Sequence, residues 1–329
     1  MMSHNLLIVG YLLLVTFFII MNYYLFLPYL KKLKFGQSIR QEGPRSHLKK
    51  SGTPTMGGII IFVSFVLVFI SLLFLTKNSN DINYNYLILI FIPLTGYFAI
   101  GFIDDFLIIW KRKNQGLKAI TKFIFQLIIA LSFYIVLVFL DYDTHLYFLN
   151  FKIDLIFFYG LFIILIFTST TNATNLTDGV DGLLTISTIP LLVGFVIIGF
   201  FKNYQLVVFL SISLLISLLA FLFFNFPKAK IFMGDTGSLF IGALICLITI
   251  LLKIELYLLI MGLVYVIEVV TVILQVGYFK LTKGKRLFKM TPFHHQLELS
   301  GYSDLKIDLI FFLISTICVI ISLILLGVF

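Results

Sequence analysis

Residues Leu87 to Asp105 read LILIFIPLTGYFAIGFIDD, an apolar run that ends in two adjacent carboxylates. The apolar part, Leu87–Ile103, approaches the roughly 20 residues that a helix needs to cross a bilayer. A carboxylate near hydrocarbon costs several kcal/mol unless it is paired or hydrated. The stretch therefore predicts a membrane helix with a functional site at one end.

The rest of the chain has the same character. Its 329 residues are 60% hydrophobic and 12% charged, whereas about a quarter of the residues in a soluble domain are charged. Further apolar stretches of near-spanning length bring the expected number of helices to about ten; they cover 5–30, 56–75, 87–103, 119–140, 154–170, 183–201, 206–224, 237–252, 256–279 and 306–327. We expect an all-α, polytopic membrane protein that forms a single integral membrane domain over 1–329. Strands are not expected, because these runs lack the alternation of a membrane barrel.

Basic residues predict the orientation. Of the 24 Lys and Arg residues, 20 fall in the odd-numbered connections between the expected spans. The positive-inside rule places those connections in the cytoplasm and both termini outside. Asp104 and Asp105 then lie on the cytoplasmic side.

Two further acidic segments fall on the same side. Residues 172–182 read NATNLTDGVDG and contain Asp178 and Asp181, while residues 232–238 read FMGDTGS and contain Asp235. The first segment has no Lys or Arg to neutralise its acids. Clustered hard oxygen ligands favour a bound cation, and Mg²⁺ is the simplest choice.

Each motif also has a plainer interpretation. Adjacent Asp104 and Asp105 repel one another, which makes them candidates for base and metal roles, but they could also be an interfacial pair that reaches water. Asp235 precedes a predicted helix and could simply be its N-cap. The glycine-rich loop 43–58 could contact an anion through its backbone amides or be an ordinary turn.

The last basic connection contains residues 290–298, MTPFHHQLE. His294 and His295 lack the spacing of a zinc-binding helix, so a contact with phosphate is the better interpretation. Glu268 lies within an expected span, where a polar contact in helix packing is expected. Cys246 and Cys318 lie in apolar runs, so neither a disulfide framework nor a thiolate metal site is expected.

Taken together, these motifs resemble the phospho-N-acetylmuramoyl-pentapeptide transferases of the polyprenyl-phosphate N-acetylhexosamine-1-phosphate transferase superfamily. They are GTPTMGG at 52–58, the aspartate pair, the two acidic segments and the histidine motif, and they occur in the order of that family. Two positions depart from its pattern. Ile108 stands where a lysine is usual, so either Lys111 replaces that charge or the charge is dispensable. Gln296 stands where a third histidine is usual.

The resemblance implies a Mg²⁺-dependent enzyme of peptidoglycan biosynthesis in the bacterial plasma membrane. It would transfer phospho-MurNAc-pentapeptide from UDP-MurNAc-pentapeptide to undecaprenyl phosphate, giving lipid I and UMP. Asp235 would bind the metal. Asp104 would deprotonate the lipid phosphate with help from Asp105, or would instead form a covalent intermediate. Lys122 and His294 would contact phosphates. The residues expected to line the uridine pocket are Lys50, Leu176, Asp181, Asn225 and Phe232, and further substrate contacts are expected from Asn172, Asn175, Asp178 and His295.

Membrane lipid is the other expected partner, a homodimer is left open, and no basic soluble domain exists to hold nucleic acid. Two alternative functions remain. A sister transferase that uses UDP-GlcNAc is disfavoured by TPTMGG at 53–58 and by His294 and His295. A transporter with an acidic ion path predicts acids near mid-membrane, where only Glu268 qualifies.

Overall fold

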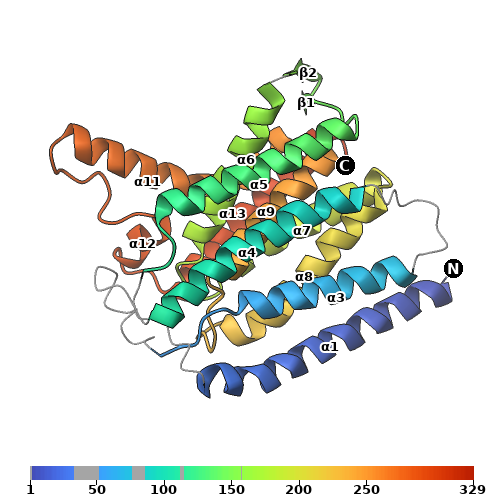
Figure 1. The fold of residues 1–329 in the computed structure, drawn as a ribbon, viewed down its shortest axis with the longest axis horizontal. Helices are drawn as coiled ribbons and strands as arrows, with labels where there is room; N and C mark the ends of the chain where they lie inside the picture. Colours follow the sequence, from blue (N-terminus) through green and yellow to red (C-terminus); the bar gives the residue numbers. More distant parts are fainter. Residues whose placement is uncertain (1, 33–51, 76–85, 112–114, 157) are drawn as a thin grey trace.

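The computed structural model describes residues 2–32, 52–75, 86–111, 115–156 and 158–329, and these form a bundle of long helices (Figure 1). The long helices are α1 (Met2–Lys32), α3 (Gly58–Leu75), α4 (Leu87–Lys111), α5 (Ala119–Phe139), α6 (Phe158–Thr177), α7 (Leu183–Phe201), α8 (Gln205–Asn225), α9 (Asp235–Leu252), α11 (Leu263–Leu281) and α13 (Asp304–Leu325). Short elements are η2 (Glu255–Tyr257), α10 (Leu258–Met261) and α12 (Phe293–Glu298). The predicted helical class is confirmed.

Eight helices in the described part of the chain are long and apolar enough to cross a membrane. They are α3, α4, α5, α7, α8, α9, α11 and α13. The two other predicted spans, over 5–30 and 154–170, form helices α1 and α6. The chain is therefore a multi-pass membrane protein, while ten crossings and the outside location of the termini stay predictions.

The predicted span over 256–279 is not one continuous helix. It is divided into η2, α10 and α11, and the break between α10 and α11 falls at Gly262. Glycine is a poor residue for the interior of a helix, because its backbone loses the most freedom when it is ordered. Beyond the break, α11 first packs against α6 and α13, and its far end extends away from the bundle (Figure 1).

A β-hairpin corrects the expectation that the chain has no strands. Strands β1 (His145–Phe148) and β2 (Phe151–Asp154) pair antiparallel between α5 and α6. Leu149, in the two-residue turn, has φ 51°, the positive value that such tight hairpin turns require. The prediction failed here because it tested only alternation over membrane-length runs, and these strands have four residues each.

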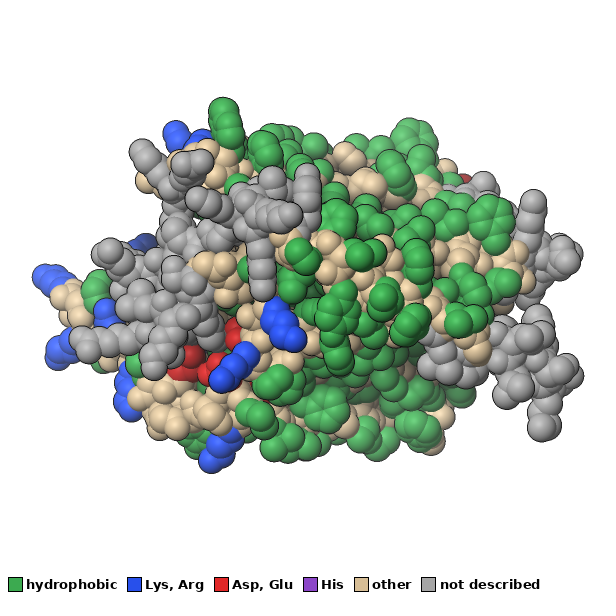
Figure 2. Space-filling model, turned by 90° about the horizontal axis from the view of Figure 1, so that it is seen from below, with side chains coloured by type: hydrophobic (Ala, Val, Ile, Leu, Met, Phe, Trp, Pro, Cys, Tyr) green, Lys and Arg blue, Asp and Glu red, His purple; other side chains and the backbone are tan. Residues whose placement is uncertain are grey.

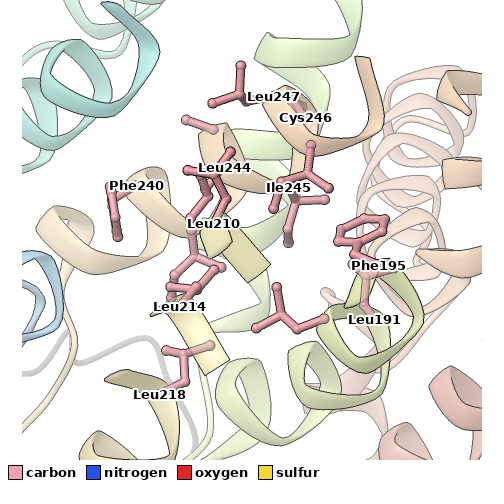
Figure 3. Packing of buried hydrophobic residues seen from close by; sticks show 14 of the residues in the cluster. Leu191, Phe195, Leu210, Leu214, Leu218, Phe240, Leu244, Ile245, Cys246 and Leu247 are labelled. Atoms are coloured by element: carbon pink, nitrogen blue, oxygen red, sulfur yellow. The ribbon is translucent and has the colours of Figure 1, made fainter. Parts of the chain in front are cut away.

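Helix α9 lies at the centre of the bundle and packs against α3, α4, α6 and α8. Of its membrane-length window, 94% is buried, compared with 22% for α5 and α11. Figure 3 shows how Phe240 and Leu244 of α9 lie beside Leu210 and Leu214 of α8 in the core. Because α9 begins at Asp235, this buried helix fixes the position of one predicted site residue.

Glycines allow the first turn of α9 to approach its neighbours closely. A Cβ at Gly101 in α4 would overlap the backbone of Asp235 and would lie 2.6 Å from Cα of Thr236. A Cβ at Gly58 at the start of α3 would overlap the backbone of Gly237. Backbone atoms cannot move aside as the end of a flexible side chain can, so both positions require glycine.

We expect Gly101→Ala to lower the free energy of unfolding by about 1–3 kcal/mol, because the added methyl group must separate α4 from α9. The matched control is Gly277→Ala in α11, where a Cβ would meet nothing within 4 Å. There, alanine should be neutral or stabilising by about 0.5–1 kcal/mol. Thermal unfolding in one detergent compares the two variants, and equal midpoints would show that the close approach is not required.

Candidate functional site

Three carboxylates meet where α4 approaches the beginning of α9. Asp104, Asp105 and Asp235 each offer one oxygen, and these oxygens all lie within 4.8 Å of one another. Asp104 and Asp105 are buried, while Asp235 is partly exposed. Figure 2 shows acidic side chains near one end of the molecule, beside Lys and Arg, where the hydrophobic surface gives way to charged groups. The structure thus brings together three of the aspartates that the sequence singled out.

Asp105 caps the N-terminus of α9 from the neighbouring helix. Its Oδ1 accepts a hydrogen bond from the Asp235 N–H at 3.2 Å, and its Oδ2 accepts from the Thr236 N–H at 3.0 Å and the Thr236 hydroxyl at 2.6 Å. The first amides of a helix have no partner within the helix, and a carboxylate there also faces the positive end of the helix dipole. Both oxygens of Asp105 are thus engaged in placing Asp235.

Asp235 does not act as the N-cap that its sequence position allowed. Gly234 occupies the N-cap position with φ 74° and, as a glycine, has no side chain to cap the helix. The carboxylate of Asp235 instead forms an ion pair with the Lys122 ammonium of α5 and accepts a hydrogen bond from Asn175 Nδ2 of α6 at 2.7 Å. Three helices therefore converge on this side chain.

Asp104 has fewer hydrogen-bond partners than Asp105. Its Oδ1 accepts a hydrogen bond from the Leu117 N–H at 2.7 Å, and Gly116 approaches its carboxylate so closely that a Cβ there would lie 2.5 Å from Oδ1. The neighbouring Asp235 carboxylate is close enough to repel it unless a proton or cation lies between them. The Asp104 and Asp235 pair can therefore bind a cation, exchange a proton, or do both.

The predicted acidic segment that follows α6 lies close enough to this cluster for the cluster's charges to act on Asp178. Burial, followed by the charges of Asp235 and Asp105, raises the pKa of Asp178 well above its ordinary value. Asp181 is buried, and its Oδ2 accepts a hydrogen bond from the Ala229 N–H at 2.9 Å. These two acids thus have different environments although they are only three positions apart.

Asn225 holds two loops together. Its Oδ1 accepts a hydrogen bond from the Gly182 N–H at 2.7 Å, and its Nδ2 donates to the Ile231 carbonyl at 2.9 Å. Phe232, which is partly exposed, donates its N–H to the Pro54 carbonyl and accepts at its own carbonyl from the Gly57 N–H. The GTPTMGG segment is thereby attached to the segment that leads into α9.

His294 forms a buried pair with Glu268, one helix away. The Nδ1 atom of His294 lies 2.8 Å from Glu268 Oε2, and the His294 N–H donates to Glu268 Oε1 at 3.1 Å. Both side chains are almost fully buried, and His294 Nε2 has no hydrogen-bond partner in the described part of the chain. That atom faces Gly179, where a Cβ would overlap it. Glu268 thus orients the ring so that Nε2 faces the acidic loop.

Sequence reasoning missed this role of Glu268 and assigned it to helix packing. A signal was present, since a buried carboxylate within a membrane span requires a partner. The histidine lies 26 positions further along the chain, and no local pattern connects the two.

Three other predicted residues are not part of the carboxylate cluster. Asn172, one turn before Asn175, donates to Gln126 Oε1 at 2.9 Å and to the Thr168 carbonyl at 2.8 Å. His295 Nδ1 lies 2.6 Å from Glu298 Oε2 on α12. Leu176 is a partly buried residue of α6.

Two basic residues of interest stand apart. Lys50 lies outside the described residues. Lys111 is the exposed last residue of α4, and the expectation that it replaces the charge missing at Ile108 stays a prediction.

Comparisons with known proteins agree with the motifs. Residues 86–253 match the family described as Glycosyl transferase family 4, and residues 50–62 match Phospho-N-acetylmuramoyl-pentapeptide-transferase signature 1. The first match includes all three clustered aspartates.

Several relatives with the second name match this chain over nearly their whole length. The Phospho-N-acetylmuramoyl-pentapeptide-transferase of Staphylococcus epidermidis is 42% identical over 304 residues, which cover 91% of this chain and 93% of the relative. That of Staphylococcus saprophyticus is 43% identical over 302 residues, covering 90% and 92%. That of Listeria monocytogenes is 40% identical over 300 residues, covering 91% of each.

The capping geometry predicts different costs for the two adjacent aspartates. Asp105→Ala leaves two backbone amides and one hydroxyl without their acceptor, and should lower the free energy of unfolding by about 1–3 kcal/mol. Asp104→Ala frees only the Leu117 amide and removes a repulsive neighbour of Asp235, so its cost should be smaller. Denaturation of both variants in one detergent measures the difference, and an equal or larger loss for Asp104→Ala would contradict the capping role.

Proposed function

The chain belongs to the phospho-N-acetylmuramoyl-pentapeptide transferase family, and we infer that it transfers phospho-MurNAc-pentapeptide from UDP-MurNAc-pentapeptide to undecaprenyl phosphate. The products are lipid I and UMP, and the reaction belongs to peptidoglycan synthesis. The observation that carries this inference is the buried cluster of Asp104, Asp105 and Asp235 at one end of a multi-pass helical bundle. A water-soluble nucleotide and a lipid phosphate can meet only at such an end.

The two alternatives have less support. A transferase that uses UDP-GlcNAc is disfavoured because residues 50–62 match the muramoyl signature and because the relatives carry the muramoyl name. An ion-transporting path would need acids within the bundle. The candidate, Glu268, has both carboxylate oxygens engaged with His294.

The carboxylate cluster fits a divalent metal, and we assign Mg²⁺. Asp104 and Asp235 supply the hard oxygen ligands that Mg²⁺ prefers, and these oxygens lie within 4.8 Å of one another. Asp105 contributes indirectly, because its oxygens hold the first turn of α9. Bound there, Mg²⁺ would neutralise negative charge on the phosphates during transfer.

Chain residues around the cluster have distinct proposed roles. Asp104 accepts the proton of the lipid phosphate, which makes that oxygen a better nucleophile. Lys122, whose ammonium now pairs with Asp235, turns to a phosphate when substrate binds. His294 presents Nε2 to a second phosphate oxygen, and Glu268 holds the ring in that orientation.

For the uridine we propose a pocket between the end of α6 and the segment before α9. Leu176 and the partly exposed Phe232 contact the base. Lys50, the first residue of the signature match, is proposed as a further contact. Asp181 and Asn225 would shape this pocket by holding its loops together, and their hydrogen bonds to Ala229, Gly182 and Ile231 support this role. Asn172, Asn175, Asp178 and His295 complete the polar wall.

An apolar groove offers a place for the lipid chain of the acceptor. It has a volume of about 290 Å³ and runs between α6 and α11, from Phe162 and Glu255 to Ala173 and Val270. Ala173 lies two positions before Asn175, which contacts Asp235. A polyprenyl tail in this groove would therefore place its phosphate beside the cluster. We propose that this end of the bundle faces the cytoplasm, which the distribution of basic residues supports.

The inferred activity can be measured directly. Purified chain, UDP-MurNAc-pentapeptide, undecaprenyl phosphate and Mg²⁺ should release UMP and form lipid I, and omission of either substrate should abolish both products. Replacing the nucleotide sugar by UDP-GlcNAc tests the sister activity in the same assay. If UDP-GlcNAc releases UMP in this assay and UDP-MurNAc-pentapeptide does not, the proposed function is wrong.

Two glutamates that each pair with a histidine provide a test of the His294 role. Glu268→Gln keeps the side-chain shape but removes the charge that orients His294, so kcat/KM should fall at least tenfold, about 1.4 kcal/mol. Glu298→Gln removes the corresponding partner of His295 and should change kcat/KM by no more than about threefold. If the two variants have similar kinetics, the oriented-histidine role is wrong.

A further inference from the structure

A second polar site lies at the opposite end of the bundle from the aspartate cluster. A pocket of about 730 Å³ is lined there by residues that include Lys202, Lys253 and Asn150. Helix α9 connects the two sites, since Asp235 begins it and Lys253 directly follows it. Its 18 residues rise about 27 Å, close to the thickness of the hydrocarbon core. The pocket therefore opens on the membrane face opposite the transferase site.

Lysines are rare on this face. The predicted topology leaves four basic residues on this side, and two of them, Lys202 and Lys253, line the pocket. The other two are Lys77 and Lys152. The rule that governs topology disfavours basic residues here, so their presence needs a local reason.

The presence of Lys253 on this face is explained by its contacts. Its ammonium lies 3.7 Å from the buried Glu255 carboxylate and donates to the Asp143 carbonyl and the Tyr159 hydroxyl. It compensates a carboxylate that would otherwise be buried without a counter-charge. Lys253 therefore contributes positive charge to the wall but has few free donors.

Lys202 is different. Its ammonium donates to the Leu252 carbonyl at 2.7 Å, a neutral acceptor, and no carboxylate lies within ion-pair distance of it among the described residues. The nearby Asp143 carboxylate already accepts from the His145 N–H and the Tyr147 hydroxyl. Burial lowers the pKa of Lys202, an effect that the charge of Glu255 opposes. Lys202 is an exposed residue of the pocket lining, and its ammonium keeps free N–H groups.

We propose that this pocket is an anion site that binds a phosphate group through the Lys202 ammonium and the Asn150 amide on its wall. The phosphate could belong to a phospholipid headgroup of the adjacent leaflet or to a soluble phosphate compound. Both have the charge and acceptor oxygens that an ammonium binds best. The site does not depend on the transfer reaction at the other end.

The test uses the full chain in phosphatidylcholine nanodiscs. Inorganic phosphate is titrated by calorimetry, and phosphatidylglycerol retention is measured by native mass spectrometry. Lys202→Gln should weaken binding of at least one probe by about fivefold or more, because it removes a charge-assisted contact. The matched control, Lys152→Gln, removes an exposed lysine of the same end that does not line the pocket, and it should stay within about twofold of the parent. UMP release should be unchanged in both variants.

A second measurement does not depend on the variants folding. Reductive methylation of Lys202 in the unaltered chain should be slowed by the bound probe, while methylation of Lys152 should not. Protection by phosphate would identify a soluble ligand, and protection by phosphatidylglycerol alone would identify a lipid headgroup. The proposal is overturned if neither probe protects Lys202, or if Lys202→Gln and Lys152→Gln bind both probes equally.

Discussion

The contact between Asp105 and the first amides of α9 is the interaction on which the rest of the site depends. α9 is buried almost throughout, so its N-terminal amides have little access to water and need an acceptor from another part of the chain. Asp105 supplies it from α4, and this fixes Asp235 beside Asp104. Glycine at Gly101 permits the close approach. The geometry of the carboxylate cluster is thus a consequence of how one buried helix begins.

Polar groups of α6 support that arrangement. Asn175 donates to Asp235 and also to the Ser238 hydroxyl one turn into α9. Thr174 donates to the Ser238 carbonyl at 2.9 Å. Each of these buried groups has a partner, so its desolvation is largely offset. The interface between α6 and α9 is therefore polar at the site end and apolar beyond it.

Much of this could be predicted from the sequence, and the reasons are physical. Carboxylates at the ends of apolar runs are costly, so Asp104, Asp105 and Asp235 could be identified before any fold was known. Their division of labour could not, because which carboxylate caps α9 depends on the approach of two helices that are distant in sequence. The pairing of Glu268 with His294 and the loop contacts of Asn225 are long-range for the same reason. The β-hairpin was missed because four-residue strands are too short for membrane periodicity.

The central claim is that Asp104 and Asp235 together hold a divalent cation, while Asp105 positions Asp235 by capping α9. Mn²⁺ can take the place of Mg²⁺ at hard oxygen sites, and its binding to the purified chain can be titrated by electron paramagnetic resonance without any turnover. The account predicts a saturable Mn²⁺ site that Asp235→Asn loses and that Asp154→Asn, which changes an exposed carboxylate on β2, retains. Equal Mn²⁺ binding by the parent chain and by Asp235→Asn would contradict it.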